Sequence, residues 1–554
     1  MGRWFRSSVA SARSWRRQVG GAGGRRPRLL AGAAGLLTLS VVVPTSVVAS
    51  AQGTRHPLRH AKVASGGTLT VLEGAAFLGN DPGGLDPATS PTVLANASFL
   101  DAVYGALFEV GSGGKVIPDL ATGYQFSDGA RTLTIDLRRG TTFSDGTPFN
   151  AAAVVFNFKR DLGTKTSGSN PPWPANPTIT APNASTVVVH FSTPDGAALN
   201  ELLDTNLTWM VSPTALAKLG EKKFRVYPVG AGPFEVVSDT LSTKLVLNRN
   251  PHYWQAGHPY LSGLVFENVS SDESALETLK SGGAQAYEYM TTPQLVSAFK
   301  SSGLTVTADP GVSTLDVQIE TIPPFNNLKA REALYYATDS VAIDQKIFDG
   351  TCPISQSFTG PGGLFYEPKV PGYRTYDLAK AKALVKSVGG LSFTMYYPAG
   401  GYNQNEAVAL QTMFKAAGMQ VTIKQDPDLS SFVAEYNTHK WTVIPASIGS
   451  FDPAGGIGVS FRLASTGPFT GIHDLTVDKY IDAGAAGATT SVRAAAYAKL
   501  ASYLNQQAYT PFICTPTSWD VVAKGVTGPG LTTATGGFGE GPLVRWEAVS
   551  LGNR

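Results

Sequence analysis

The sequence predicts an α/β protein with mixed sheets and more than one domain. Short runs that alternate between apolar and polar residues, such as 132–138, are interleaved with helical patterns such as 151–160. Residues 391–397, 406–417 and 420–424 have the patterns of a strand, a helix and a strand, and a crossing of that length favours parallel pairing. The chain of 554 residues is long enough for several domains with a sizeable core.

The clearest local structure is predicted between residues 118 and 160. Residues 132–138 alternate in polarity, which is typical of a half-buried strand. The turn residues Ser127-Asp128-Gly129 precede this strand. Asn150 stands at the N-cap position of the helix predicted for residues 151–160. By pattern alone, the stretch is a strand, a turn and a capped helix, with no catalytic spacing.

The same stretch resembles the signature of the family 5 extracytoplasmic solute-binding proteins, the peptide-, oligopeptide- and nickel-binding components of ABC importers. The matching runs are Pro118-Asp119-Leu120-Ala121, Asp128-Gly129, Leu137-Arg138-Arg139-Gly140, Phe143 and Asp145-Gly146-Thr147-Pro148. Further matches are Leu85-Asp86-Pro87, Asn250-Pro251-His252-Tyr253-Trp254 and Tyr376-Asp377-Leu378-Ala379. The chain departs from the family at Ala152-Ala153, where an acidic pair is usual at the helix start.

The resemblance covers most of residues 66–550 and implies a two-lobed periplasmic-binding-protein fold of type II. Two crossing strands should join the lobes, and an extra subdomain should be inserted in the first lobe. The expected boundaries are 1–51 for an export signal, 52–65 for a disordered lead-in, 66–310 for the first lobe with its subdomain at about 110–225, 311–508 for the second lobe, and 509–554 for the return to the first.

Residues 1–51 have the pattern of an export signal. An Arg-rich region reaches Arg28, an apolar run follows, and Ala49-Ser50-Ala51 suits cleavage. The alternative is a retained membrane anchor, since the apolar run is about long enough to span a bilayer. Arg25-Arg26 also resembles part of a twin-Arg signal, which leaves the export route open. The protein is expected to be exported and to be extracellular, at the cell surface or periplasmic.

Charge and motif content argue against several function classes. The 44 basic residues include eight arginines in residues 1–51, a stretch without acids, so the rest holds 36 basic and 41 acidic residues. This mildly acidic body does not suggest a nucleic-acid partner. The sequence contains no His-Glu-x-x-His, Gly-x-Ser-x-Gly or P-loop motif, and its seven His are scattered without metal-ligand spacing. We therefore predict no catalytic residues, no metal site and no cofactor.

Cys352 and Cys514 are the only cysteines. In an exported protein such a pair is either a disulfide or two buried free thiols, and the sequence alone leaves both open. The resemblance favours a bridge, because the family fold places both neighbourhoods near the cleft and the hinge.

The function implied by the resemblance is that of the solute-binding component of an ABC importer. A small-molecule or peptide ligand would be enclosed between two closing lobes and delivered to permease subunits by a protein expected to be a monomer. The first alternative is a structural or signalling surface protein that keeps the fold without transport. A hydrolase is the second alternative, and no motif supports it.

Six loop residues are candidate ligand contacts. They come from the loop after Leu-Asp-Pro and from loops at strand ends of the second lobe, where open α/β sheets bind ligands. They are Ser90, Phe358 as an apolar wall, Tyr397, Asn403, Ser447 and Ser450. In peptide-binding relatives, the loop before Asp452-Pro453 carries an Asp that pairs with the ligand's amino group. This chain has Gly449 and Ser450 there, which puts free peptides in doubt as ligands.

Other conspicuous residues are expected to have structural roles. Asp86 should cap a turn, Arg331 should be paired or capping, and Tyr253 and Trp254 should be core aromatics. Trp173 lies in a polar, Pro-rich loop and is expected to be a surface aromatic that packs on that loop.

Overall fold

A computed structural model describes residues 65–552 apart from 75–83, 90–96, 112–114, 165–172, 310, 399–402, 428–430, 432–440, 450, 456–470 and 533–543. The described residues belong to one compact unit, Lys62–Arg554. The export signal and lead-in expected for residues 1–65 lie almost wholly outside the described residues. Within the described part of the chain, no helix is long and apolar enough to cross a membrane.

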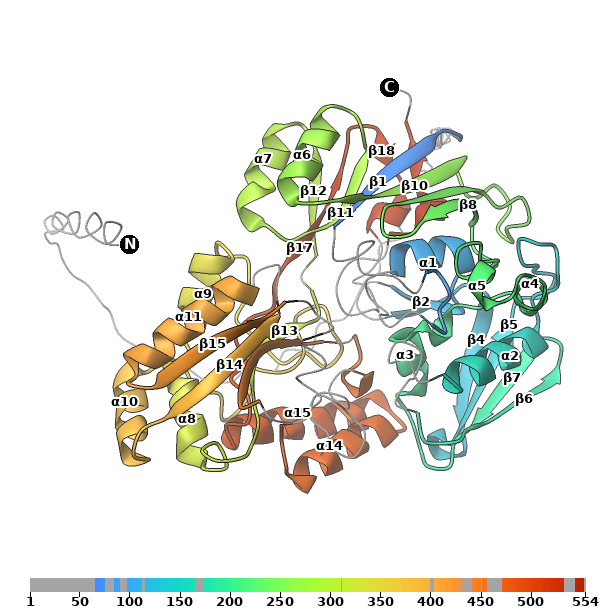
Figure 1. Ribbon diagram of the computed structural model, residues 1–554. Coiled ribbons are helices and arrows are strands. Elements are labelled where there is room, and N and C mark those ends of the chain that lie inside the picture. Colours follow the sequence, from blue (N-terminus) through green and yellow to red (C-terminus); the bar gives the residue numbers. More distant parts are fainter. Residues whose placement is uncertain are drawn as a thin grey trace, which may run out of the picture. The chain divides into compact units, whose positions relative to one another are not determined.

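The first lobe is built on a seven-stranded sheet with the order β12-β17-β11-β1-β10-β9-β8 (Figure 1). Its strands are β1 (Thr68–Gly74), β8 (Phe234–Thr240), β9 (Lys244–Arg249), β10 (Gly263–Val269), β11 (Ala286–Met290), β12 (Thr305–Asp309) and β17 (Ser518–Val522). β1 pairs in parallel with both β10 and β11, whereas β17 is antiparallel to β11 and β12. The sheet is therefore mixed, as the sequence predicts.

Two apolar clusters cover the two faces of this sheet. Leu69 and Val71 of β1 pack with helix α1 (Ala97–Tyr104), while Leu72 packs with helices α6 (Asp272–Lys280) and α7 (Val296–Ser301). Side chains alternate along a strand, so neighbouring residues of β1 enter different cores. The remaining short elements near the chain end are β18 (Val526–Thr527) and β19 (Ser550–Leu551), which pair with each other.

A second, four-stranded sheet has the order β4-β5-β7-β6, and we call it the inserted sheet. Its strands are β4 (Ala121–Ser127), β5 (Thr132–Leu137), β6 (Thr178–Asn183) and β7 (Thr186–His190), and helix α2 (Ala151–Leu162) packs on it. The Asn150 side chain accepts a hydrogen bond from the Ala153 amide at 3.1 Å, so the predicted strand, helix and N-cap are confirmed. Nearby elements are β2 (Phe108–Gly111), β3 (Lys115–Pro118), α3 (Ala198–Leu203), α4 (Pro213–Leu219) and α5 (Glu221–Phe224).

The expected surface position of Trp173 is wrong. Its side chain is buried between Phe158 of α2 and Phe191, with edge-to-face contacts to both rings. The indole nitrogen donates a hydrogen bond to the Ala198 carbonyl oxygen at 2.9 Å. A polar sequence around a large aromatic residue does not prevent its burial when the indole N–H finds an acceptor.

The second lobe contains a four-stranded sheet with the order β13-β16-β14-β15. Its elements are β13 (Thr314–Ile319), α8 (Leu328–Ala337), α9 (Ser340–Ile347), α10 (Leu378–Ser387), β14 (Ser392–Pro398), α11 (Asn403–Ala416), β15 (Gln420–Asp426), β16 (Val443–Ile448), α14 (Leu475–Ala486) and α15 (Thr490–Gln506). β14 and β15 pair in parallel around α11, which confirms the predicted strand, helix and strand. Arg331 donates to the carbonyl oxygens of Phe325 and Gln507, a structural role as expected.

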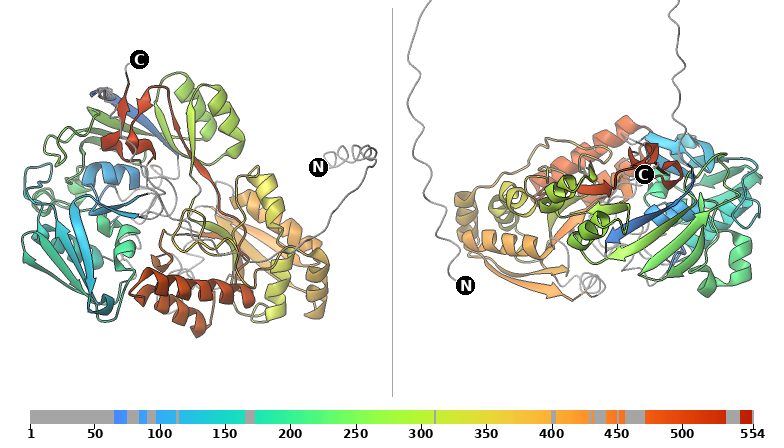
Figure 2. Two further views of the ribbon diagram at one scale, coloured as in Figure 1. Left: turned by 180° about the vertical axis from the view of Figure 1, so that it is seen from behind. Right: turned by 90° about the horizontal axis from the view of Figure 1, so that it is seen from above.

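Two crossing segments connect the sheets. Residues 311–313 lead from β12 to β13, and residues 515–517 lead back into β17. In Figure 1 and in the left view of Figure 2, the red β17 continues toward the yellow and orange elements of the second lobe. These crossing segments place both lobes around one hinge region.

Candidate functional site: a pocket at the hinge

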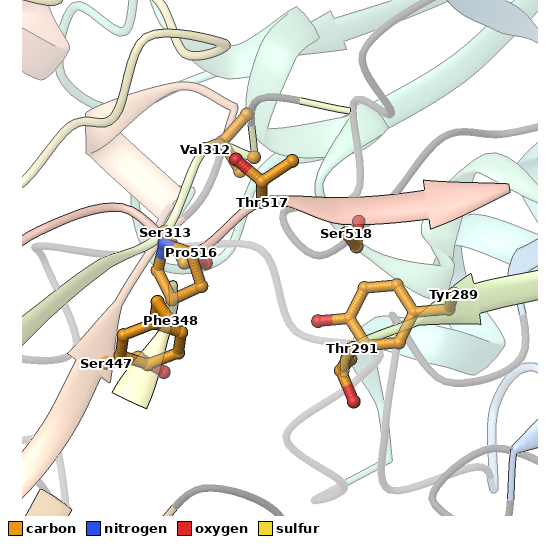
Figure 3. Close-up of a pocket in the computed structure, with 10 residues that line it drawn as sticks. Tyr289, Thr291, Val312, Ser313, Phe348, Ser447, Pro516, Thr517 and Ser518 are labelled. Atoms are coloured by element: carbon orange, nitrogen blue, oxygen red, sulfur yellow. The ribbon is translucent and has the colours of Figure 1, made fainter. Parts of the chain in front are cut away.

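A pocket lies where the two crossing segments meet both lobes (Figure 3). It contains about 480 Å³ of space not filled by protein, part of which is open to solvent. Its wall is formed by Tyr289, Thr291, Gly311, Val312, Ser313, Phe348, Ser447, Pro516, Thr517 and Ser518. Apolar rings and hydroxyl groups therefore share the wall, a composition suited to a small organic solute.

Glycines allow the hinge backbones to approach closely. A Cβ on Gly311 would lie 2.6 Å from the carbonyl oxygen of Pro516, and a Cβ on Gly449 would lie 1.9 Å from Oγ of Ser313. Any larger residue would push the segments apart. Gly449 thus brings the end of β16, with Ser447, against the first crossing segment.

Tyr289 enters the pocket through an unusual backbone conformation. Its φ is 60°, and the pairing of β11 with β17 shifts register between Tyr287 and Met290. A positive φ is uncommon for a residue with a Cβ, and a bulge redirects the side chain. Figure 3 shows the Tyr289 hydroxyl directed across the pocket toward Phe348 and Pro516.

Asp452 joins the second lobe to the inserted-sheet region. Its Oδ1 accepts from the Arg493 guanidinium at 2.6 Å, and its Oδ2 accepts from the Asn200 amide at 2.7 Å. Its own backbone N–H donates to Oδ2 of Asp204 at 3.1 Å. Phe451, which directly precedes Asp452 in the chain, is fully buried in the core of the inserted sheet. Asp452 is therefore occupied by protein partners.

Acidic groups surround this contact. Burial raises the pKa of Asp195 from 3.8 to about 7, with the neighbouring Glu201 and the backbone of Ala197 lowering it by less. Burial also raises the pKa values of Glu201 and Asp204 well above their ordinary range. Arg493 is the cation that faces these carboxyl groups, and the nearby Asp452 raises its pKa despite burial.

The Leu-Asp-Pro loop is anchored by an ion pair. Arg160 of α2 contacts both carboxylate oxygens of Asp86, at 2.8 and 2.5 Å. Asp86 also accepts from the Ala88 amide at 3.2 Å, which is the expected turn cap. The two-pronged ion pair holds this loop on the inserted sheet's helix, a contact that the sequence does not reveal.

The six predicted contact residues lie in different surroundings. Ser447 is exposed and lines the pocket. Phe358 is buried against Tyr497 and Phe512, Tyr397 is buried in the second-lobe core, and Asn403 begins α11. Ser90 and Ser450 lie outside the described residues. The assignment of all six as ligand contacts stays a prediction.

Sequence reasoning missed most of the pocket wall. Tyr289, Phe348 and Ser518 belong to segments whose only signal was a strand end or a helix end. The expected pair of crossing strands between the lobes was the one signal that could have indicated residues 311–313 and 515–518 as part of the pocket wall.

Cys352 and Cys514 are joined by a disulfide with Cα atoms 5.4 Å apart. The bridge links the segment after α9 to the strand-like segment that precedes the second crossing. Both residues are fully buried in the second-lobe core. Among the described residues, no group of three or more His, Cys, Asp or Glu could hold a metal ion.

Solved structures with the same arrangement define the class of protein. The ABC transporter substrate-binding protein CtaP of Listeria monocytogenes matches with a TM-score of 0.74 at 22% identity, covering 88% of this chain and 100% of that chain. DppA of Helicobacter pylori, an ABC transporter-associated periplasmic binding protein solved with the peptide STSA, matches with a TM-score of 0.74 at 20% identity, covering 88% and 99%. The fold is that of the two-lobed periplasmic binding proteins.

The family follows from the sequence. Residues 115–465 match the family described as bacterial extracellular solute-binding proteins, family 5 middle, and the chain belongs to this family. The glutathione-binding protein GsiB of Salmonella choleraesuis is 31% identical over 317 residues, which cover 56% of this chain and 61% of that protein. GsiB of Escherichia coli K12 is 30% identical over 345 residues, covering 61% and 66%. The chain thus spans about three fifths of the length of these curated relatives, and the predicted family and fold are confirmed.

Proposed function

We propose that this protein is the solute-binding component of an ABC importer. It captures a small solute between its two lobes outside the cytoplasm and presents the closed form to a permease. The observation that carries the proposal is the hinge pocket, because first-lobe, second-lobe and crossing residues all contribute to its wall. A solute that contacts both lobes favours the closed arrangement by its differential affinity for it.

The solute class is a small molecule or a peptide-like compound. GsiB is named for glutathione, DppA was solved with a tetrapeptide, and NikZ of Campylobacter jejuni with Ni(L-His). The wall of this pocket offers apolar rings beside hydroxyl groups. We infer from the named roles of its relatives that the protein binds its solute without chemical turnover. That it acts as a monomer remains our expectation from the sequence.

The test is solute binding by the purified protein without residues 1–51. Native mass spectrometry would show any solute that is retained through purification. A thermal-shift panel of peptides, glutathione, sugars, opines and metal chelates then identifies the class, because a solute that binds the folded state raises the melting temperature by mass action. Small-angle scattering with the best hit should show a decrease in the radius of gyration. Absence of any shift across the panel, together with unchanged scattering, would support a structural or signalling role instead.

The contact residues are tested with the same hit. Replacing Ser447 by Trp should weaken binding, because Ser447 lines the pocket and is exposed. Replacing Ser450 by a bulky residue carries the same expectation from its position in the sequence. Unchanged affinity in either variant removes that residue from the predicted contacts.

A further inference from the structure

The disulfide joins two segments that both contribute to the wall of the hinge pocket. Phe348 lines the pocket and precedes Cys352 by four residues. Thr517 also lines the pocket and follows Cys514 by three residues (Figure 3). The two cysteines are 162 positions apart in the sequence. Neither cysteine belongs to the pocket wall itself, so the bridge acts on a solute only through these neighbours.

A short antiparallel ladder continues on both sides of the bridge. We call residues 348–355 the wall segment and residues 513–517 the return segment, and Ile354 of the first pairs with Cys514 of the second. Three hydrogen bonds flank this pair: from the Ser355 amide to the Ile513 carbonyl oxygen at 3.2 Å, from the Thr515 amide to that of Pro353 at 3.0 Å, and from the Thr517 hydroxyl to that of Thr351 at 2.6 Å. The bridge therefore locks the register of two segments that carry pocket residues.

The start of the second-lobe sheet belongs to the same unit. The Leu315 amide of β13 donates to the Cys514 carbonyl oxygen at 2.8 Å. The hydroxyl oxygen of Thr314 lies 3.0 Å from that of Ser355 and 3.3 Å from that of Thr515, and all three residues are buried. Satisfied networks of buried polar groups are rigid. Both crossing segments are thus fastened to the wall segment at their second-lobe ends.

This fastening determines where the lobes bend. The Gly362 amide of a second-lobe loop donates to the Gly311 carbonyl oxygen at 2.9 Å, so the first crossing segment is held by the second lobe up to its start. In the second crossing segment, Thr517 is bonded to the wall segment, and Ser518 already belongs to β17. A hinge motion is absorbed by a few backbone positions between rigid parts. The bending falls at Gly311 and at the junction of Thr517 and Ser518, and Phe348 and Thr517 move as one body with the second lobe.

The bridge is the covalent part of this body. The Cys352 amide donates to Oδ1 of Asp344 at 2.8 Å, and the Thr351 amide donates to the Phe348 carbonyl oxygen at 3.0 Å, which ties Phe348 and the end of α9 to the bridge. A pocket whose walls are already in the bound geometry does not lose affinity to the cost of ordering them. Without the bridge, hydrogen bonds and packing alone hold Phe348 and Thr517 together, and their relative motion increases.

We propose that Cys352 and Cys514 are positioning residues for solute binding: their disulfide holds the Phe348 and Thr517 parts of the pocket wall in the geometry that the solute requires. The inference rests on the proposed function. A bridge that only stabilised the fold would raise the melting temperature and leave the affinity of the folded protein unchanged. A positioning bridge changes both.

The test compares affinities of folded proteins by titration calorimetry. The probes are the tetrapeptide STSA and S-methylglutathione, which has no thiol to attack the bridge. Below its melting transition, Cys352→Ser/Cys514→Ser should bind at least about tenfold more weakly than the wild type. The control is Val189→Ala, which opens a cavity in the separate core of the inserted sheet. It should lower the melting temperature and change the affinity by less than about twofold. Equal affinities of the bridge variant and the wild type overturn the inference, as does an equal loss in the control.

Hydrogen exchange gives a second readout that needs no solute. In the folded bridge variant, amides of the wall and return segments should exchange at least about tenfold faster, while those of the inserted sheet keep their wild-type rates. Unchanged exchange in the two segments overturns the inference whatever the affinities are. A wild type that binds neither probe nor any solute of the panel overturns the proposed function and the inference with it, even if exchange is faster in the variant.

A further variant decides the question if the bridge variant does not fold. Ser355→Ala keeps the disulfide and removes the hydroxyl that contacts Thr314. Because Ser355 is buried outside the pocket wall, it also acts on a solute only through the wall and return segments. Its affinity for the probe that binds should fall at least about threefold, and an unchanged affinity overturns the inference.

Discussion

Replacing Arg493 by Met is expected to destabilise the ligand-free protein strongly. Its side chain is 5% exposed and donates to Asp452, whose side chain is fully buried, and to the Gly484 carbonyl oxygen at 2.9 Å. Truncating one partner of a buried ion pair leaves an uncompensated charge and typically costs about 3–5 kcal/mol. Asp452 retains its amide partner Asn200, which supplies a hydrogen bond but no charge.

The second step of this prediction separates charge from packing. In the double variant Asp452→Asn/Arg493→Met, the charge of Asp452 is removed together with that of its ion-pair partner, so at least about 1 kcal/mol of the loss should be recovered. Arg493→Lys keeps the charge but not the planar fork, and it should lie between the wild type and Arg493→Met.

Urea unfolding followed by intrinsic fluorescence measures these differences as shifts in midpoint at constant slope. The reasoning is refuted if Arg493→Met costs less than about 1 kcal/mol, or if the double variant is no more stable than Arg493→Met. Half-buried Arg131, whose hydrogen bond to the Ser192 carbonyl oxygen is exposed to solvent, offers a control: Arg131→Met should change stability by less than about 1 kcal/mol.

Four further predictions concern stability and the hinge. Burial raises the pKa of Asp195 from 3.8 to about 7 in the folded protein, so its stabilising contribution is present at low pH and is lost as the pH rises toward 7. Asp195→Asn should therefore flatten the decline in unfolding free energy between pH 4 and 7, and an unchanged profile would contradict this. The disulfide should leave no thiol to titrate in the unfolded, unreduced protein, and two reactive thiols would show that the bridge is absent. The variant Cys352→Ser/Cys514→Ser should lose up to about 5 kcal/mol of unfolding free energy, by the chain-entropy argument for a closed loop of 162 residues. Gly449→Ala should lower both the melting temperature and the solute affinity because its Cβ meets Ser313, whereas Gly123→Ala, whose Cβ meets nothing within 4 Å, should leave the affinity unchanged; equal effects would argue against the close approach. Arg160→Met should destabilise the protein by about 3–5 kcal/mol and Arg160→Met/Asp86→Asn by less, since the single change leaves Asp86 buried without its cation; thermal melts of the two variants compare these losses directly.

Local structure could be predicted from the sequence where apolar residues recur with the spacing of a strand or a helix. The alternation of residues 132–138 and the cap at Asn150 predicted β5 and the start of α2. The order of residues 391–424 predicted the parallel pair β14 and β15. In each case the determining residues lie within one turn, one strand or one crossing, so burial of one face is encoded in sequence spacing.

The candidate site could be predicted only in part. Ser447 was among the expected contacts and lines the hinge pocket. Tyr289 and Phe348 carry no sequence signal of that role, because a bulge and a helix end aim them into the pocket. The burial of Trp173 likewise depended on Phe158, Phe191 and an acceptor at Ala198, which local polarity does not report.

The sequence by itself determined the α/β class, the family and the local elements with their caps and turns. The tertiary structure alone decided which distant residues meet. Glu73 and Glu288 become neighbours through the parallel register of β1 and β11, and Asn200 reaches Asp452 across 252 positions of sequence. Strand register and core packing set these meetings, and both are collective properties of the whole fold rather than of any short segment.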